Sequence, residues 1–121
     1  IFTTMPGPAL HRAAAEAARV LRRGGVLYVA EFAQNWDNPH YRRRYEKGRK
    51  KGYVRGAFDA ESVSGGLEYV ARHFTRDELD SFFAATGLET EYYRGEKIRT
   101  QSGNIIDGHI FIAVKNPGGL T

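Results

Sequence analysis

The chain has 121 residues, of which 41% are hydrophobic and 26% charged, a composition typical of one globular domain with a modest core. It contains no cysteine, which excludes a disulfide framework and a thiolate metal site. No apolar run approaches the roughly 20 residues needed to span a bilayer, and no charged-then-apolar leader opens the chain. The sequence therefore predicts a cytoplasmic protein without membrane contact.

The net charge of +4 is unevenly distributed along the sequence. Segment 42–55 contains eight basic residues against a single acid, Glu46, which makes it +7. The rest of the chain keeps 10 of the 18 basic and 13 of the 14 acidic residues, or −3. Because the basic character belongs to one stretch, the net charge alone does not indicate a general affinity for nucleic acid.

The N-terminal part predicts a helix followed by a buried strand. A turn rich in proline and glycine at 6–8 precedes apolar residues at helical spacing, which predict a helix over 9–23. The double glycine at 24–25 ends this helix, because glycine adopts the left-handed conformation at little cost. The apolar run 26–32 follows, and its continuity predicts a strand covered on both faces, as in parallel α/β sheets.

The middle of the chain is polar and is interrupted by several glycines and a proline. We therefore expect residues 34–72 to be irregular, apart from a short helix over 39–51. An irregular stretch of this length in a compact domain is typical of a lid or a binding loop.

A second helix begins where regular patterning returns. Thr75 is placed to cap it, and Glu78, three residues later, completes a capping box. Phe74 and Leu79 are placed for a hydrophobic staple across the same helix start, and Gly87 ends the helix.

The end of the sequence predicts an antiparallel hairpin. Residues 88–100 form the first strand, and the apolar run 109–114 forms the second. Turn-forming residues fill the segment 101–108 between them, including Ser-Gly-Asn and Asp-Gly sequences.

Three stretches of the sequence carry a resemblance to a known family. Residues 18–27 read ARVLRRGGVL, residues 73–79 read HFTRDEL, and residues 110–115 read IFIAVK. In this order they are similar to the approach to the fifth strand, a later helix and the closing strands of class I S-adenosylmethionine-dependent methyltransferases. The resemblance covers nearly the whole chain and leaves 34–72 as the family's variable lid and substrate region.

The resemblance implies an α/β fold class, namely the C-terminal half of a Rossmann-like methyltransferase fold. The expected order is helix, strand, variable lid, helix and antiparallel hairpin. The three strands are expected to form a mixed sheet, with the last strand in the middle. Residues 1–121 would then be one partial methyltransferase domain.

The same resemblance implies methyl transfer from S-adenosylmethionine to an acceptor that these residues do not identify. The family's first strand, its glycine-rich loop and the acidic residue that holds the cofactor's ribose belong to a region that precedes this sequence. No G-x-G-x-x-G occurs in the chain. We therefore expect this chain to be the substrate-side half of the enzyme and inactive by itself.

The resemblance also suggests which residues contact the ligands. Residues 1–5 are similar to the passage after the family's fourth strand, which borders the methionine end of the cofactor, so Thr4 and Met5 are candidates for cofactor binding. Ligands of open α/β sheets bind beyond the carboxyl ends of the strands. Candidates for substrate binding at that edge and in the lid are Glu31, Phe32, Tyr41, Arg72 and His73.

Histidines offer few further candidates. His73 is a candidate catalytic residue that orients or deprotonates an acceptor, with a surface histidine before a helix cap as the alternative. His11 and His109 are expected to have structural roles. The four histidines show no metal-ligand spacing, so the sequence predicts no metal site.

The basic segment 42–55 has two interpretations. The first is a solvated helical lid. The second is a surface that attracts an anionic acceptor, either a small molecule or RNA, with interleaved tyrosines for stacking. The second interpretation also supports an alternative function for the chain, as a non-catalytic module that binds RNA or a partner.

The resemblance leaves one sheet edge without a partner. In the family, the strand corresponding to 26–32 pairs with a strand that is not in this sequence. An exposed apolar edge promotes association. We therefore expect a homo-oligomer formed through strand 26–32, or association with a missing N-terminal half.

Overall fold

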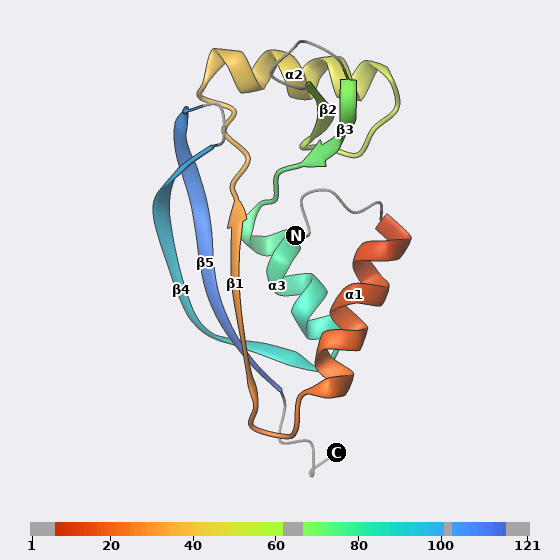
Figure 1. The fold of residues 1–121 in the computed structure, drawn as a ribbon, viewed down its shortest axis with the longest axis vertical. Helices are drawn as coiled ribbons and strands as arrows, with labels where there is room; N and C mark the ends of the chain where they lie inside the picture. Colours follow the sequence, from red (N-terminus) through yellow and green to blue (C-terminus); the bar gives the residue numbers. More distant parts are fainter. Residues whose placement is uncertain (1–6, 62–66, 101–102, 116–121) are drawn as a thin grey trace.

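The computed structural model describes residues 7–61, 67–100 and 103–115. Figure 1 shows a three-stranded sheet with two helices on one face and a smaller helix-and-hairpin module beyond one end of the sheet. The elements are α1 (Gly7–Val20), β1 (Val26–Phe32), α2 (Pro39–Lys50), β2 (Ala57–Glu61), β3 (Leu67–Arg72), α3 (Arg76–Ala85), β4 (Leu88–Arg99) and β5 (Ile105–Lys115).

The three-stranded sheet has the order β1-β5-β4, which confirms that the last strand lies in the middle. Val26 pairs with Val114 on one side of β5, and Leu88 pairs with Lys115 on the other. Both pairings are antiparallel, so the expectation of a mixed sheet is wrong. A mixed sheet needs two parallel neighbours, and the strands within the described residues form no parallel pair.

The main core lies between this sheet and the two helices α1 and α3 (Figure 1). Its buried members are Leu10, Ala18, Val29, Phe74, Leu79, Phe83, Leu88, Phe111 and Ala113. Successive side chains of a strand point to opposite faces, and both helices cover the same face. The expectation that strand 26–32 is covered on both sides is therefore wrong for the described chain, where Val26 is 58% and Tyr28 63% exposed.

The end of α1 and the start of α3 have identifiable causes. α1 ends at Val20, three residues before the predicted end, and the chain turns into β1 through Gly24 at a φ of 77°. At the start of α3 the predicted capping box is confirmed. The Thr75 hydroxyl accepts from the Glu78 N–H at 3.1 Å, and the Glu78 carboxylate accepts from the Thr75 N–H at 2.8 Å.

The short helix expected over 39–51 is confirmed as α2, whereas the expectation that the rest of 34–72 is irregular is wrong, because β2 and β3 form a hairpin that completes the module α2–β2–β3. Asn38 caps α2 by accepting from the His40 N–H at 3.0 Å, and a proline occupies the first turn. The hairpin β2–β3 then covers the apolar face of α2. The second core formed in this way consists of Tyr41, Tyr45, Phe58, Ala60, Ala71 and Ile106.

The turn between β4 and β5 is shorter than predicted. β5 begins at Ile105, and the Asp107-Gly108 pair that resembles a turn lies inside this strand. Gly108 has a packing role there, since a Cβ added to it would lie 2.0 Å from Cδ1 of Ile98 on β4. The chain reverses instead between Thr100 and Asn104, where the Thr100 N–H donates to the Asn104 carbonyl at 2.7 Å.

A second glycine sets how closely α2 approaches β2. A Cβ added to Gly48 would lie 2.2 Å from the backbone oxygen of Ala57, which cannot move without disturbing the hairpin. Alanine normally stabilises a helix interior by about 1 kcal/mol relative to glycine. Here we expect Gly48→Ala to lower the free energy of unfolding by about 1–3 kcal/mol, because the module becomes overpacked.

Urea denaturation of the wild type and of the variant measures this change. Gly95→Ala is the matched control, because the nearest atom to its added Cβ is 3.9 Å away. A Gly48→Ala protein as stable as the wild type would contradict the close packing of α2 against β2.

Candidate functional site

Two chain segments cross where the helix-and-hairpin module joins the sheet. One leaves β1 after Phe32, and the other returns from β3 to α3. The Phe74 N–H donates to the Phe32 carbonyl at 3.0 Å, and the Gln34 N–H donates to the Phe74 carbonyl at 3.1 Å. The His73 N–H donates to the Gly56 carbonyl at 2.9 Å. Backbone hydrogen bonds thus fix the positions from which the candidate side chains project.

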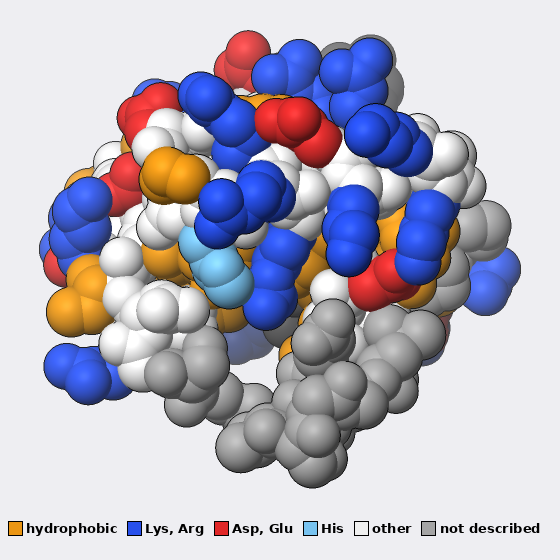
Figure 2. Space-filling view, turned by 90° about the horizontal axis from the view of Figure 1, so that it is seen from above, with side chains coloured by type: hydrophobic (Ala, Val, Ile, Leu, Met, Phe, Trp, Pro, Cys, Tyr) orange, Lys and Arg blue, Asp and Glu red, His pale blue; other side chains and the backbone are white. Residues whose placement is uncertain are grey.

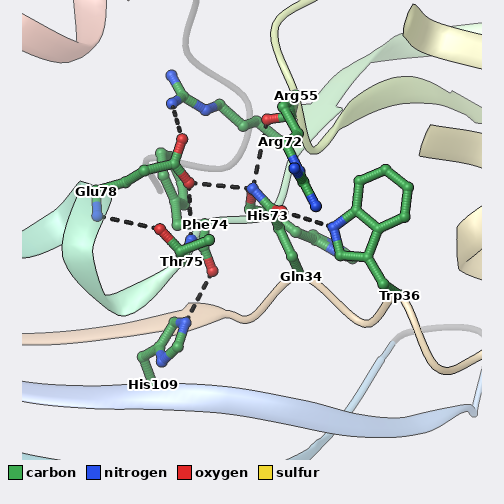
Figure 3. A network of polar contacts seen from close by, with 9 residues as sticks. All are labelled: Gln34, Trp36, Arg55, Arg72, His73, Phe74, Thr75, Glu78 and His109. Atoms are coloured by element: carbon green, nitrogen blue, oxygen red, sulfur yellow. Dashed lines mark hydrogen bonds and ion pairs between the residues drawn. The ribbon is translucent and has the colours of Figure 1, made fainter. Parts of the chain in front are cut away.

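The amide of Gln34 holds this crossing together (Figure 3). Its Nε2 lies 3.1 Å from the Glu78 carboxylate, 3.3 Å from the His73 carbonyl and 3.4 Å from the Arg55 carbonyl. Its Oε1 accepts from the Trp36 indole at 2.7 Å. A single side chain therefore connects the end of β1, the loop before β2, the segment after β3 and the first turn of α3.

A glycine makes room for that amide. Gly56 has a φ of 90°, a conformation that favours glycine, and its added Cβ would lie 2.5 Å from Nε2 of Gln34. The sequence contains no pattern that singles out Gln34, since its distant partners Arg55, His73 and Glu78 come from three other segments.

His73 lies in an aromatic enclosure formed on the module side of the crossing. Its side chain is 3% exposed. The ring centroids of Phe58, Phe32 and Tyr41 lie 4.9, 5.4 and 5.4 Å from that of the imidazole. The structure thus brings together three of the sequence candidates, Phe32, Tyr41 and His73. It places His73 in a buried site, so the alternative of a surface histidine is wrong.

The hydrogen bonding of His73 defines which ring nitrogen carries the proton. Nδ1 lies 2.7 Å from the hydroxyl of Tyr45, and that hydroxyl oxygen accepts from the Asn35 N–H at 2.9 Å. Burial raises the pKa of Tyr45 to about 12, so the phenol keeps its proton. Among the described residues Nδ1 of His73 is the acceptor within reach of that hydroxyl, and we therefore assign the phenol as the donor. The proton of the neutral imidazole then sits on Nε2.

The charge state of His73 follows from the same surroundings. Burial, and secondarily the positive charge of Arg44, lower the pKa of His73 to about 4. The imidazole is therefore neutral at pH 7 and offers an N–H group at Nε2. Within the described part of the chain, Nε2 forms no hydrogen bond of its own. This arrangement suits hydrogen-bond donation to a ligand, and it does not supply a free basic nitrogen for removing a proton.

The remaining substrate candidates lie outside this enclosure. Arg72 points to the opposite side from His73, where its guanidinium pairs with Glu78 at 2.8 Å and lies 4.8 Å from the Phe74 ring centroid. Its Nε is the one buried side-chain polar atom of the described residues that lacks a hydrogen-bond partner. Glu31 is 4% exposed and sits opposite His109 in the sheet. The cofactor candidates Thr4 and Met5 lie outside the described residues.

Other histidines have structural contacts. His109 lies 2.8 Å from the Phe74 carbonyl through Nε2 and 2.7 Å from the Tyr93 hydroxyl through Nδ1, so it joins β5 to the crossing (Figure 3). His11 packs edge-on against Phe82 at 4.8 Å. In the described residues, no three His, Cys, Asp or Glu side chains come together as metal ligands, and no helix is long and apolar enough to cross a membrane.

The basic segment forms one wall of a surface groove. Figure 2, which looks down on the module, shows lysine and arginine side chains spread over this end of the molecule. The groove has a volume of about 490 Å³, and we call it the basic groove. Its lining residues are His40, Arg43, Arg44, Glu46, Lys47, Lys50, Lys51 and Asp59. The sequence predicted the charge, whereas the groove and the contribution of Asp59 from β2 were not predictable without the hairpin.

Comparison with known proteins identifies solved structures with a similar fold. A scan against models of protein families finds no match, and a search of curated proteins finds none. Among solved structures, the chain is similar to a SAM-dependent methyltransferase from Methanosarcina mazei, with 36% identity and a TM-score of 0.88 over 95% of this chain. It is also similar to the 1,6-didemethyltoxoflavin-N1-methyltransferase of Burkholderia thailandensis, with 12% identity and a TM-score of 0.60 over 96% of this chain.

The second of these structures contains 1,6-didemethyltoxoflavin and S-adenosylhomocysteine. The chain spans 55% of the length of the Methanosarcina protein and 40% of the Burkholderia protein. The fold of this chain is therefore that of the corresponding part of S-adenosylmethionine-dependent methyltransferases, as the resemblance predicted.

The buried state of His73 makes stability depend on pH. The unfolded chain binds a proton at this side chain below its ordinary pKa of 6.5, whereas the native enclosure resists protonation until about pH 4. Stability is therefore complete above pH 6.5 and falls as the pH drops toward 4. We expect this group to reduce the free energy of unfolding by up to about 3 kcal/mol across that window.

Denaturant unfolding at a series of pH values between 7.5 and 4 measures the effect, in steps of about half a unit. His73→Asn keeps an acceptor for Tyr45 but does not titrate in this range, so its stability should fall less steeply with acid. His11→Asn, at an exposed position outside this enclosure, is the matched control for the loss of a histidine. Equal slopes for wild type and His73→Asn would contradict the buried neutral imidazole.

Proposed function

We propose that this chain is the C-terminal, substrate-side half of an S-adenosylmethionine-dependent methyltransferase. The observation that carries the proposal is the 36% identity to the Methanosarcina methyltransferase over 95% of this chain. Two further features support it: the fold shared with the Burkholderia enzyme, and a buried histidine enclosure beyond the carboxyl end of β1. Doubly wound sheets bind their ligands beyond the carboxyl ends of parallel strands, and we propose that β1 has such parallel neighbours in the whole enzyme.

In this proposal the module α2–β2–β3 forms part of the wall around the methyl acceptor. The sulfonium of S-adenosylmethionine supplies an activated methyl group, so the protein mainly has to align the acceptor with it. The Nε2 proton of His73 is available to orient an acceptor that carries an oxygen or an unprotonated nitrogen. Phe32 and Tyr41 supply apolar contacts beside it. The acceptor class we propose is anionic, either a small molecule or RNA, because the same module carries the basic groove.

The cofactor itself requires more than this chain. No glycine-rich phosphate or nucleotide loop occurs in the sequence, and the candidates Thr4 and Met5 lie outside the described residues. We therefore assign no step of methyl transfer to a side chain here. We propose that the isolated chain is inactive and that the rest of the enzyme completes the cofactor site.

A chimera tests the proposal. In it, this chain replaces the matching 55% of the Methanosarcina protein, and the remainder of that protein is kept. We expect the chimera to bind S-adenosylhomocysteine, whereas the isolated chain does not bind it measurably. Isothermal titration calorimetry measures both, with the intact Methanosarcina protein as the reference. Tight binding by the isolated chain, or a folded chimera that binds none, would overturn the proposal.

The outer edge of β1 is where we propose that the remainder of the enzyme adds a strand. The Ala33 N–H donates to the Asp107 carbonyl, and the Gly25 carbonyl accepts from Lys115, so the odd-numbered residues bond to β5. The backbone groups of Val26, Tyr28 and Ala30 therefore point to the opposite edge. Among the described residues, this outer edge has one backbone partner, at its end, where the Phe32 carbonyl accepts from the Phe74 N–H.

A substitution in β1 tests whether a further strand pairs with this edge without disturbing the sheet itself. Tyr28→Pro removes an outward N–H and leaves the hydrogen bonds between β1 and β5 in place, because proline is tolerated at an edge. We expect the chain to form a complex with the remaining part of the Methanosarcina protein, and Tyr28→Pro to abolish it. Tyr28→Ala, which keeps the N–H, should preserve it.

Size-exclusion chromatography with light scattering measures these complexes. If the edge pairs with a second copy of the chain, the expected result is a dimer that Tyr28→Pro also dissociates. A dilute monomer that joins neither partner would contradict pairing through this edge.

A further inference from the structure

The basic groove has features beyond those of a solvated helix face. Its cations come from one flank of α2 and continue past the end of the helix to Lys51. Residues three or four apart on a helix lie on the same side, so the contributing side chains form a row. At about 1.5 Å per residue, the row from His40 to Lys51 extends over roughly 16 Å. The members of the row are His40, Arg43, Arg44, Lys47, Lys50 and Lys51.

The wall of the groove opposite α2 belongs to β2, and it holds the last cation of the row. Asp59 on β2 forms an ion pair with Lys51 and accepts a hydrogen bond from the Tyr53 hydroxyl at 2.7 Å. This anchors one end of the groove. The lining otherwise holds the cations Arg43, Arg44, Lys47 and Lys50 against Glu46. The charge facing the groove is therefore strongly positive even after the ion pair of Lys51 is discounted.

Arg44 is held in a fixed position. Its guanidinium carbon lies 5.9 Å from the ring centroid of Tyr41 and 5.8 Å from that of Phe58, both of which belong to the core of the module. A guanidinium that rests on aromatic faces loses less conformational entropy when it binds an anion. Next to it, His40 lies 5.0 Å from Tyr41 with its ring edge-on, and the His40 side chain is exposed. Its free face is suitable for stacking against a nucleobase.

The shape of the groove selects among anionic ligands. A compact phosphate needs donors that converge on one point, whereas the lysines and arginines of the row follow a line of roughly 12 Å from Arg43 to Lys51. A single row along one flank also matches one backbone rather than the two of a duplex. A row of cations beside an exposed ring is the combination that binds single-stranded nucleic acid with little sequence preference.

From these observations we infer that the basic groove binds the sugar–phosphate backbone of a single strand of nucleic acid along α2. The groove contacts phosphates, so RNA and DNA strands should bind alike. The inference does not depend on methyl transfer, and its test needs no cofactor.

Salt dependence and a pair of matched variants test the inference. The probes are fluorescein-labelled 12-nucleotide strands of mixed sequence, one of RNA and one of DNA, and fluorescence polarisation measures binding to the full 121-residue chain. With three or four phosphates neutralised, the affinity should fall roughly 20- to 50-fold between about 50 and 200 mM salt. The RNA and DNA strands should agree within about threefold, since phosphate contacts carry no sequence or sugar information.

The variants are Lys47→Glu and Arg49→Glu, which change the net charge equally and lie two positions apart on α2. Lys47 lines the groove, whereas Arg49 is exposed and is not part of its lining. Lys47→Glu should weaken binding about tenfold or more and make the salt dependence shallower by roughly one phosphate contact. Arg49→Glu should weaken it by less than about threefold. Circular dichroism confirms that both variants are folded.

Three outcomes would overturn the inference. The first is no binding of either strand at low salt. The second is equal loss of affinity in both variants, which would show that net charge rather than the groove attracts the strand. The third is competition by free tripolyphosphate at the same molar concentration as the strand, which would show a site for a compact polyphosphate.

Discussion

The side-chain amide of Gln34 is the contact on which the arrangement of the two parts of the molecule depends. It reaches the Glu78 carboxylate, the Trp36 indole and two backbone carbonyls, and the glycine at 56 leaves space for it. Gln34 is half-buried, and a polar group withdrawn from water is costly unless it is paired, so these partners favour one geometry at the crossing. The same carboxylate of Glu78 caps α3 and pairs with Arg72. The main core, the module and the helix start are therefore coupled through one network.

That geometry determines the chemistry of His73. The strand end places the imidazole among aromatic rings, and the Tyr45 hydroxyl occupies Nδ1, which leaves the proton on Nε2. Burial keeps the ring neutral at pH 7. In the methyltransferase that we propose, a neutral donor in an apolar enclosure suits recognition of an acceptor more than removal of its proton, because alignment is the main requirement when the methyl donor is already activated.

The basic groove lies on the outer side of the same module. Arg44 connects the two sites, because it rests on Tyr41 and Phe58 and its charge also lowers the pKa of His73. An anion in the groove would weaken that electrostatic effect on the histidine. The outer edge of β1 and the basic groove have no residues in common, so the two interactions that we propose for them, with a further strand and with a nucleic acid strand, do not compete for residues.

The sequence by itself determined the elements whose cause is local. The capping box of α3 was confirmed, and the strand over 26–32 and a closing antiparallel hairpin were found where short-range patterns predicted them. The end of α1 and the turn of the hairpin differ from the prediction by several residues. The resemblance read from these stretches predicted the fold and the central position of β5. Tertiary structure decided what local patterns do not contain: the hairpin β2–β3, the packing role of Gly108, the antiparallel sheet, and the neighbours of His73. Phe32, Tyr45 and Phe58 come from three elements and His73 from the segment after β3, so only the folded chain brings them within contact distance.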